Sequence, residues 1–490
     1  MPWLTDATLI LISSLVISFV YVILVPTGVE LCDYVRFTYL VNLLTFFCVL
    51  YLWETIDRSE TDYLYLCQIP FLVDYSLNFS LGVDGISLPF LLLCLVITSL
   101  CFYSMENFKS SMLKLPQGKY AVILLILIQI FTILSFLTTN LFFFYVFFES
   151  ILIPMFLFIG IWGSRERRIN AAYYFFLYTL FGSFFLLFGI LYIYTVSSNL
   201  DYVNLNNLCL TVNEQLVLWI CFFIPFAVKV PMFPFHIWLP EAHVEAPTLG
   251  SVILASLLLK LGGYGFLRFT LPMFPIAVDQ YMCIVYLLAI LSIVYASFTT
   301  IRQSDLKKVV AYSSVAHMNV VVLGIFSNNY QGIDGSIYLM IGHGFVSAAL
   351  FFIIGILYDR YHTRAIKYYG GLVQTMPMFS IFFLIFTLAN MGFPGTVNFI
   401  GEFLIFIGVY EYSFGMVLFA ASSIVLSAVY SIFLYNRVVF GTMKLYSFSD
   451  LNRTEFLILL FLGVCTVYFG ISSENITKIT QTAISLLLIN

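Results

Sequence analysis

Five ionisable side chains lie inside long apolar stretches of the sequence. They are two carboxylic acids, two lysines and one histidine: Glu149, Lys229, Lys260, His317 and Glu402. A charge at the centre of a bilayer costs about 2.5 to 3.5 kcal/mol on insertion scales, so each of these groups needs a paired or hydrated surrounding. Carboxylates, desolvated lysines and imidazoles can exchange protons near neutral pH, whereas arginine keeps its proton. The five residues therefore predict a proton path between helices, which we prefer over a set of purely structural ion pairs.

Two of these residues lie next to interruptions rich in glycine and proline. Pro231 and Pro234 follow Lys229 closely. Because proline lacks a backbone donor, a helix that contains Lys229 should break there and leave carbonyls that need water or a partner. The segment Asn390-Met-Gly-Phe-Pro394-Gly interrupts a second apolar stretch shortly before Glu402. Paired interruptions of this kind in corresponding halves of a chain indicate the ion site of a transporter.

The composition is that of a protein embedded in lipid. Of its 490 residues, 62% are hydrophobic and 9% are charged, whereas soluble domains contain about 25% charged residues. The nine cysteines include no CxxC pair, so neither a disulfide framework nor a metal site is indicated. The mild net charge of -4 gives no reason to expect a nucleic-acid partner.

Apolar runs recur from Leu9 almost to the C-terminus. Counting runs of bilayer length predicts an all-α integral membrane protein with about 14 transmembrane helices, of which the seventh and the twelfth are broken. Arg and Lys concentrate in alternate loops, for example at Arg165, Arg302 and Arg360. This pattern is expected if every second loop faces the cytoplasm or matrix, and it supports the count independently of hydropathy.

The interrupted spans also indicate an internal repeat. Glu149 precedes His317 by nearly the same number of residues as Lys229 precedes Glu402. Each offset crosses an odd number of predicted spans, so the second unit should be inverted relative to the first. We expect four segments: spans one to three in residues 1–118, a five-helix repeat of spans four to eight in 119–270, an inverted repeat of spans nine to thirteen in 271–440, and span fourteen with a tail in 441–490.

Several motifs resemble one known family. The stretch AVKVPMFPFHIWLPEAHVEAPT, residues 227–248, closely resembles the signature of the antiporter-like membrane subunits of respiratory complex I. Further motifs resemble the chain 4 branch of that family, called the M chain in bacteria. They are LGVDGIS at 81–87, FESILIPM at 148–155, YSSVAHMN at 312–319 and NFIGEF at 398–403. The resemblance covers roughly residues 80 to 440.

The resemblance implies a role for each of the five ionisable residues. In that family a Glu on the fifth helix pairs with a Lys on the seventh, which correspond to Glu149 and Lys229. A central polar row then runs from an eighth-helix Lys through a His to a charged residue on the twelfth helix. By motif match these are Lys260, His317 and Glu402, and a Glu at the last position is typical of chain 4.

The resemblance also implies the biochemical setting. The chain would be a proton-translocating core subunit of NADH:ubiquinone oxidoreductase in the mitochondrial inner membrane, or in a bacterial plasma membrane. It would lie beside sibling antiporter-like subunits and membrane lipids. NADH, flavin mononucleotide, iron-sulfur clusters and ubiquinone would be held by partner subunits, since the sequence has no phosphate-binding loop or cysteine cluster. Two alternatives are the D-type subunit of a multi-subunit sodium/proton antiporter and a structural membrane-arm subunit.

Two further histidines are candidates for the pathway. His343, in a Gly-His-Gly sequence within the eleventh predicted span, would extend the proton path or be a packed, hydrogen-bonded imidazole. His236 lies in the turn after the first interruption, near His243 and Glu245. That spacing matches no common zinc pattern, and Pro240 prevents one helical face from presenting the ligands together, so we expect no metal there.

Overall fold

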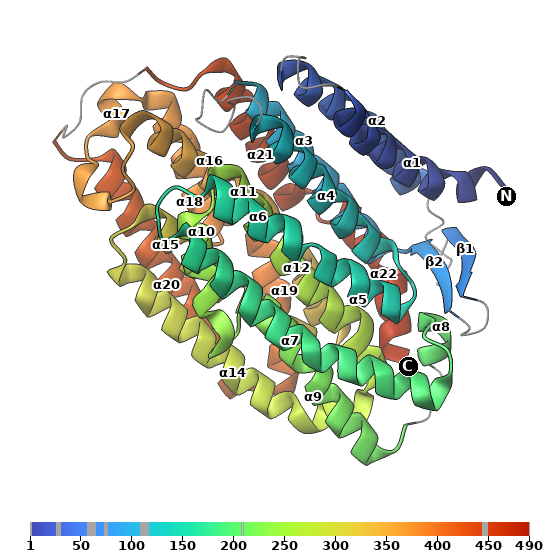
Figure 1. Ribbon diagram of the computed structural model, residues 1–490. Helices are drawn as coiled ribbons and strands as arrows, with labels where there is room; N and C mark the ends of the chain where they lie inside the picture. The colour runs from blue at the N-terminus through green and yellow to red at the C-terminus, as the bar shows by residue number, and fades with distance from the viewer. Residues whose placement is uncertain are drawn as a thin grey trace.

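The chain forms a bundle of long helices with a small β-hairpin at one end (Figure 1). The computed structural model describes residues 2–25, 31–55, 65–72, 77–107, 117–206, 208, 210–442 and 449–489. The elements of the first half are α1 (Pro2–Leu24), α2 (Leu31–Thr55), β1 (Tyr65–Leu72), β2 (Leu77–Val83), α3 (Ser87–Asn107), α4 (Gln117–Leu137), α5 (Leu141–Ser150), α6 (Leu152–Trp162), α7 (Arg168–Ser197), α8 (Tyr202–Leu205) and α9 (Val212–Lys229).

The second half begins with a run of short helical pieces. These are the 3-10 turn η3 (Phe235–Ile237), α10 (Trp238–Glu245), α11 (Thr248–Ile253), the π-helical turn η4 (Leu254–Leu258), α12 (Leu259–Gly265), the π-helical turn η5 (Phe266–Thr270) and α13 (Leu271–Met273). The remaining elements are α14 (Pro275–Arg302), α15 (Leu306–Ile325), α16 (Tyr330–Tyr361), the 3-10 turn η6 (Ile366–Tyr368), α17 (Leu372–Thr375), α18 (Pro377–Asn390), α19 (Val397–Tyr412), α20 (Phe414–Val439), α21 (Arg453–Ile471) and α22 (Glu474–Ile489).

The predicted all-α membrane architecture is confirmed. In the described part of the chain, 12 helical runs are long and apolar enough to cross a membrane, by length and composition. Two further apolar segments are not among these 12, namely Leu11–Leu24, which is part of α1, and Pro377–Asn390, which is α18. They coincide with the first predicted span and with the first half of the twelfth, so the number 14 stays a prediction. The division into inverted repeats stays a prediction as well.

A β-hairpin and a C-terminal helix are among the elements that the sequence does not predict. An antiparallel hairpin of β1 and β2 precedes α3, and helix α22 follows α21 where we expected only a tail. Helix α22 packs on α16, where the Thr480 hydroxyl donates to the buried Asp334 carboxylate at 2.6 Å. The strands are short, and α22 carries Glu474, Lys478 and Gln481 among its apolar residues, so neither element has the long apolar run on which the span count relied.

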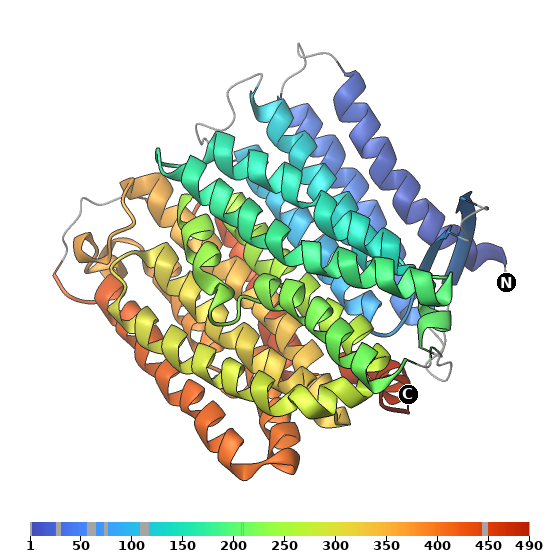
Figure 2. The ribbon, with the colours of Figure 1, turned by 60° about the horizontal axis from the view of Figure 1, so that its bottom comes forward.

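Helix α16 is the central pillar of the bundle. It packs against α15, α18, α19, α21 and α22, and its side chains from Gly332 to Leu357 are buried. A helix that is apolar on all sides is expected in the core of a large helical protein. Helices α7, α14 and α20 instead expose many Leu, Phe and Tyr side chains, as lipid-facing helices do. The N-terminal helices α1 and α2, drawn in blue, lie along one edge of the bundle (Figure 2).

Two helices are interrupted at depth in the bundle. Helix α9 ends at Lys229, and Pro231 and Pro234 lie in the turn before α10. Helix α18 ends at Asn390 and α19 begins at Val397. The second turn contains Gly392 and Gly395, whose φ angles of +74° and +91° lie in the left-handed region that glycine adopts without strain.

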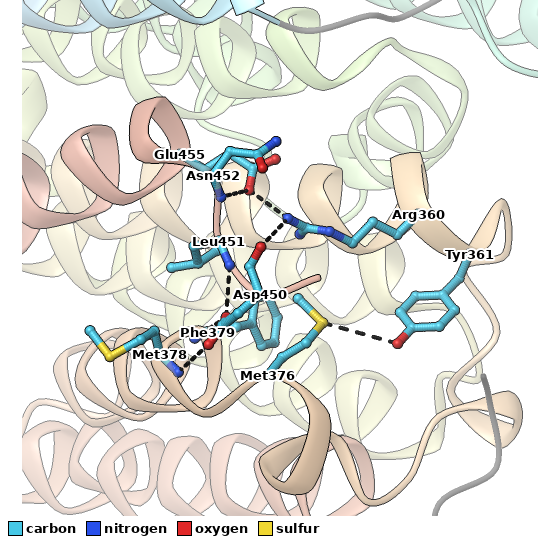
Figure 3. A network of polar contacts seen from close by, with 9 residues as sticks. All are labelled: Arg360, Tyr361, Met376, Met378, Phe379, Asp450, Leu451, Asn452 and Glu455. Carbon is cyan, nitrogen blue, oxygen red and sulfur yellow. Dashed lines mark hydrogen bonds and ion pairs between the residues drawn. The ribbon is translucent and has the colours of Figure 1, made fainter. Parts of the chain in front are cut away.

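A network of polar contacts fixes the start of α18 (Figure 3). Its first turn has no capping side chain of its own. Instead, the Asp450 carboxylate accepts the backbone N–H groups of Met378 and Phe379, at 2.8 and 3.1 Å. Arg360, near the end of α16, donates to the Asp450 carbonyl at 3.0 Å and pairs with Glu455 at 2.7 Å. The residues before α21 thus cap α18 from outside and tie it to α16.

Candidate functional site

Four of the buried ionisable groups form a row across the middle of the bundle. The Lys260 Nζ lies 2.7 Å from Nδ1 of His343 and donates to the Ala255 carbonyl at 2.6 Å. The rings of His343 and His317 have centroids 5.9 Å apart. Nδ1 of His317 lies 3.1 Å from Oε1 of Glu402. The structure therefore brings Lys260, His317 and Glu402 together, with His343 between Lys260 and His317.

Each member of this row comes from a different helix. Lys260 lies on α12, between the π-helical turns η4 and η5. His317, His343 and Glu402 lie on α15, α16 and α19. Such π-turns are rare and often occur at functional sites. All four side chains are buried.

The second interruption lies directly against the row. A Cβ atom at Gly392 would come within 2.7 Å of Oε2 of Glu402, and the φ of +74° disfavours any other residue at this position. A Cβ atom at Gly342 would come within 2.7 Å of Oδ1 of Asn398, so the lack of a side chain there lets α16 approach α19. These glycines determine how closely the backbone approaches the acidic end of the row.

Tyr430 is a member of the site that sequence reasoning missed. Its hydroxyl, on α20, lies 3.3 Å from Nε2 of His317 and is buried. Both ring nitrogens of His317 therefore have a partner, Glu402 on one side and Tyr430 on the other. Because a neutral imidazole has one donor and one acceptor nitrogen, this arrangement determines which tautomers are compatible with the site. Nothing in the sequence distinguishes Tyr430 among 33 tyrosines.

Glu149 and Lys229 are close but not in direct contact. The Lys229 Nζ lies 4.1 Å from the centroid of the Phe148 ring and 3.5 Å from the Phe148 carbonyl oxygen. It interacts electrostatically with Glu149. Among the described residues, no ion pair of 4.0 Å or less joins these two side chains. The two side chains therefore interact across more than 4.0 Å in this structure, and the pair that the family resemblance implies stays a prediction.

The Glu149 carboxyl group lies at a lateral cavity. Helix α5 ends at Ser150 and α6 begins at Leu152, so the fifth predicted span is itself interrupted next to Glu149, which we did not expect. A cavity of about 390 Å³ lies between this interruption and α7, lined by Glu149, Tyr145 and Ser183 among others. Oε1 of Glu149 is buried without a hydrogen-bond partner among the described protein groups.

Contacts through the first interruption connect Lys229 with the central row. A Cβ atom at Gly262, close to Lys260 on the same helix, would come within 3.0 Å of the Lys229 Cβ atom. The side-chain amide of Asn319, on the helix of His317, donates to the Pro231 carbonyl at 3.3 Å. Nε1 of Trp238 donates to the Val228 carbonyl at 2.9 Å. Side chains thus satisfy two backbone carbonyls around the interruption, as buried backbone requires.

The two histidines after the interruption have different positions. The ring of His236 packs against Tyr295, with centroids 5.3 Å apart, and no described hydrogen bond joins it to the central row. His243 stacks on Phe351 with centroids 4.7 Å apart and interacts electrostatically with Lys260 and Lys307. Within the described residues, no group of three or more His, Cys, Asp or Glu side chains converges as metal ligands. The sequence motif indicates for His243 only a position near the turn after the first interruption.

Comparison with known proteins identifies the family. The family described as "NADH:quinone oxidoreductase/Mrp antiporter, TM" matches residues 138–429, more than half of the chain. The NADH-ubiquinone oxidoreductase chain 4 of Marchantia polymorpha is 50% identical over 91% of this chain and 89% of its own length. That of Arabidopsis thaliana is 49% identical over 91% and 89%.

Solved structures agree with this result. A chain of respiratory complex I from Thermus thermophilus superimposes with a TM-score of 0.88 and 28% identity, covering 98% of this chain and 99% of that one. A chain of an archaeal membrane-bound sulfane sulfur reductase has a TM-score of 0.86 over 99% of both chains, but its 21% identity shows the fold alone.

The chain therefore belongs to the NADH:quinone oxidoreductase/Mrp antiporter family of membrane proteins. Within that family, the relatives near 50% identity are chain 4 proteins of NADH-ubiquinone oxidoreductase. The resemblance found in the sequence motifs is thereby confirmed.

Proposed function

We propose that this chain is the proton-translocating chain 4 subunit of the membrane arm of NADH:ubiquinone oxidoreductase, in the mitochondrial inner membrane. The observation that carries the proposal is the buried row from Lys260 through His343 and His317 to Glu402. Similarity to eukaryotic chain 4 proteins over about nine-tenths of the chain and the match to a complex I chain support this setting. The neighbours would be sibling antiporter-like subunits and lipid.

The contact between Lys260 and His343 is suited to sharing a proton. Two nitrogen atoms 2.7 Å apart need one hydrogen between them. Either the ammonium group donates to the imidazole, or the protonated ring donates to a neutral amine. A single proton transfer converts one state into the other, without movement of either helix.

His317 would pass the proton to Glu402. When the His317 ring accepts a proton on one nitrogen, it can release the proton on its other nitrogen. The acceptor would be the Glu402 carboxylate, whose Oε1 lies 3.1 Å from Nδ1 of His317. The centroid separation of 5.9 Å between the two imidazoles leaves a step that needs a bridging water or a ring rotation. Both side-chain amide atoms of Asn398, near Glu402 on α19, are buried without a protein partner among the described groups. Buried polar atoms of this kind are normally hydrogen-bonded to ordered water, which supports a hydrated route here.

The Glu149 and Lys229 pair would control the row electrostatically. At an effective dielectric constant of about 20, two charges 4 Å apart interact by about 4 kcal/mol, and a looser pair interacts by less. Each 1.4 kcal/mol changes a protonation equilibrium about tenfold. Protonation of Glu149 would therefore shift the proton affinity of Lys229 considerably. Because Lys229 packs against Gly262 of α12, the change in charge at Lys229 would affect Lys260, which lies on α12 as well.

The energy for pumping must come from partner subunits. Moving one proton against about 150 mV takes about 3.5 kcal/mol. We propose that no cofactor binds this chain, and that NADH, flavin mononucleotide, iron-sulfur clusters and ubiquinone are held by its partners. We further propose that residues 119–270 and 271–440 are inverted repeats. Support comes from the paired interruptions, one next to Lys229 and one next to Glu402.

The substitution Lys260→Arg tests the proposal. Arginine keeps the positive charge and the length of the side chain but does not release a proton. In vesicles that contain the assembled complex, we expect NADH-driven proton pumping to fall at least tenfold relative to wild type. The matched control is Lys367→Arg, which makes the same change at an exposed position in the 3-10 turn η6. Normal pumping by an assembled Lys260→Arg complex would show that Lys260 has only a structural role.

The alternative of a sodium/proton antiporter subunit makes a different prediction. In that case the chain would purify without flavin and iron-sulfur subunits, and its activity would depend on sodium. The near 50% identity with chain 4 proteins over about nine-tenths of the chain favours the complex I subunit.

A further inference from the structure

An apolar groove runs along the outside of the bundle, on the side opposite α14. Helices α2 and α21 both pack on α3 and leave a cavity of about 490 Å³ between them. The three helices run side by side in Figure 1, with α21 partly behind α3. The cavity holds none of the ionisable residues of the proton path. Its existence does not depend on the proposed function.

The groove is built from matching stripes on three helices. Tyr39, Leu43 and Phe46 line it from α2, spaced three and four residues apart. The floor is the corresponding stripe of α3, which includes Val96 and Leu100. This spacing places successive side chains on one face of each helix, so the groove runs along the helix axes. Leu44 and Phe47, which flank the α2 stripe, are 65% and 61% exposed, so the groove opens toward lipid.

The α21 wall of the groove has the same periodicity. Leu457, Leu460 and Val464 lie on one face of that helix, and their side chains are 40%, 40% and 59% exposed. A groove with apolar walls at membrane depth accommodates a hydrocarbon chain better than a polar ligand.

One end of the groove is polar and basic. The aromatic rings of Tyr39 and Tyr103, from α2 and α3, lie 5.6 Å apart at this end. Continuing the α2 stripe by one turn leads to Arg36, and continuing the α21 stripe by one turn leads to Arg453. Both arginines are exposed. Tyrosine and arginine at the end of an apolar stripe are typical of the membrane interface, where they meet lipid head groups.

We propose that this groove is a binding site for an anionic phospholipid. An acyl chain lies along the stripes of α2, α3 and α21, and the phosphate group lies between Arg36 and Arg453. The two arginines give the site its charge complementarity, since a polybasic surface favours anionic over zwitterionic head groups. The helix ends that carry them are on the face where Arg and Lys concentrate, so the lipid belongs to the inner leaflet.

Photolabelling of the assembled complex tests this site. The complex is reconstituted with phosphatidylglycerol that carries a diazirine in its acyl chain, or with phosphatidylcholine that carries the same chain. After irradiation, adducts are mapped by mass spectrometry of peptides. We expect labelling of the peptides that contain Val96 to Tyr103 and Leu457 to Val464. Each arginine that binds the phosphate should make phosphatidylglycerol label these peptides about five-fold more strongly than phosphatidylcholine does.

Two variants separate head-group recognition from acyl-chain binding. Arg453→Gln should lower phosphatidylglycerol labelling about five-fold and leave phosphatidylcholine labelling unchanged. Val96→Trp should fill the floor of the groove and abolish labelling by both lipids. The matched control is Leu177→Trp on α7, a lipid-facing position away from the groove, which should not alter labelling. Because Arg453 is exposed, the Arg453→Gln variant should assemble normally. It therefore still tests the proposal if Val96→Trp does not assemble.

Three results would overturn the proposal. Equal labelling by both lipids would show an ordinary contact with bulk bilayer. Labelling no stronger than at lipid-facing peptides of α14 would show the same. An absence of labelling, with the groove peptides crosslinked to another subunit, would show that a protein partner covers the groove.

Discussion

Gly392 offers a sharp test of the link between the second interruption and the proton row. Its φ of +74° lies in the left-handed region, where an alanine costs about 1 to 2 kcal/mol. In addition, a Cβ atom at this position would lie 2.7 Å from Oε2 of Glu402, whereas ordinary contacts begin at 3.4 Å. The carboxylate of a Gly392→Ala variant must therefore move by about 0.7 Å. A shift of this size away from His317 would lengthen the 3.1 Å contact beyond hydrogen-bonding distance.

Gly395 provides a matched control in the same turn. Its φ of +91° imposes the same backbone strain on alanine, but a Cβ atom there would have no neighbour within 4 Å. The backbone strain alone should lower the thermal stability of both alanine variants by about 1 to 2 kcal/mol. Only Gly392→Ala should also lower the number of protons pumped per NADH oxidised, by several-fold, since misplacing a reacting group by about 1 Å can slow a reaction about 100-fold. The assay is NADH oxidation and pumping in vesicles, with assembly checked on native gels. Equal pumping by the two variants would refute our placement of Glu402 in the pathway.

Three further predictions follow from other contacts. Tyr430→Phe should reduce pumping while changing stability by only about 1 kcal/mol, because it removes the hydroxyl next to His317 and keeps the ring; normal pumping would exclude Tyr430 from the site. Asp450→Ala should lower the melting temperature of the complex through a loss of about 0.5 to 2 kcal/mol, since two N–H groups of α18 lose their cap, and an unchanged melting temperature would contradict this role. Asp84→Ala should impair assembly on native gels at a cost of about 3 to 5 kcal/mol, because it removes the carboxylate that pairs with the buried Arg268 guanidinium at 2.6 Å; Glu474→Ala, in an exposed pair, should assemble normally.

Much of the fold was predictable because its signals are local in the sequence. Long apolar runs and the interruptions at Pro231 and Pro394 follow directly from composition and from the chemistry of proline. The hairpin and α22 lacked such signals. The difference between the 12 clear spans and the 14 predicted ones lies in two apolar segments, Leu11–Leu24 within α1 and Pro377–Asn390, the first half of the broken twelfth span.

The candidate site was predictable for its charges but not for its neutral partners. Lys260 and Glu402 stand out because charges are rare in apolar runs. Tyr430 and Asn319 gain their roles only from helices that are distant in sequence and adjacent in space. His343 was ambiguous for the same reason, since only the position of Lys260 distinguishes a relay from a packed imidazole. The looseness of the Glu149 and Lys229 pair depends on side-chain distances that no motif encodes.

The external cap on α18 has a consequence for shortened forms of the chain. A protein that stopped before Asp450 would keep every ionisable residue of the row. It would nevertheless lose the carboxylate that holds the first turn of α18, the partner of Arg360 on the central pillar, and the helix whose Thr480 binds Asp334. The C-terminal segment thus braces the helices that hold the row. Its loss should stop proton transfer along the row, although the segment contributes none of the side chains that carry the proton.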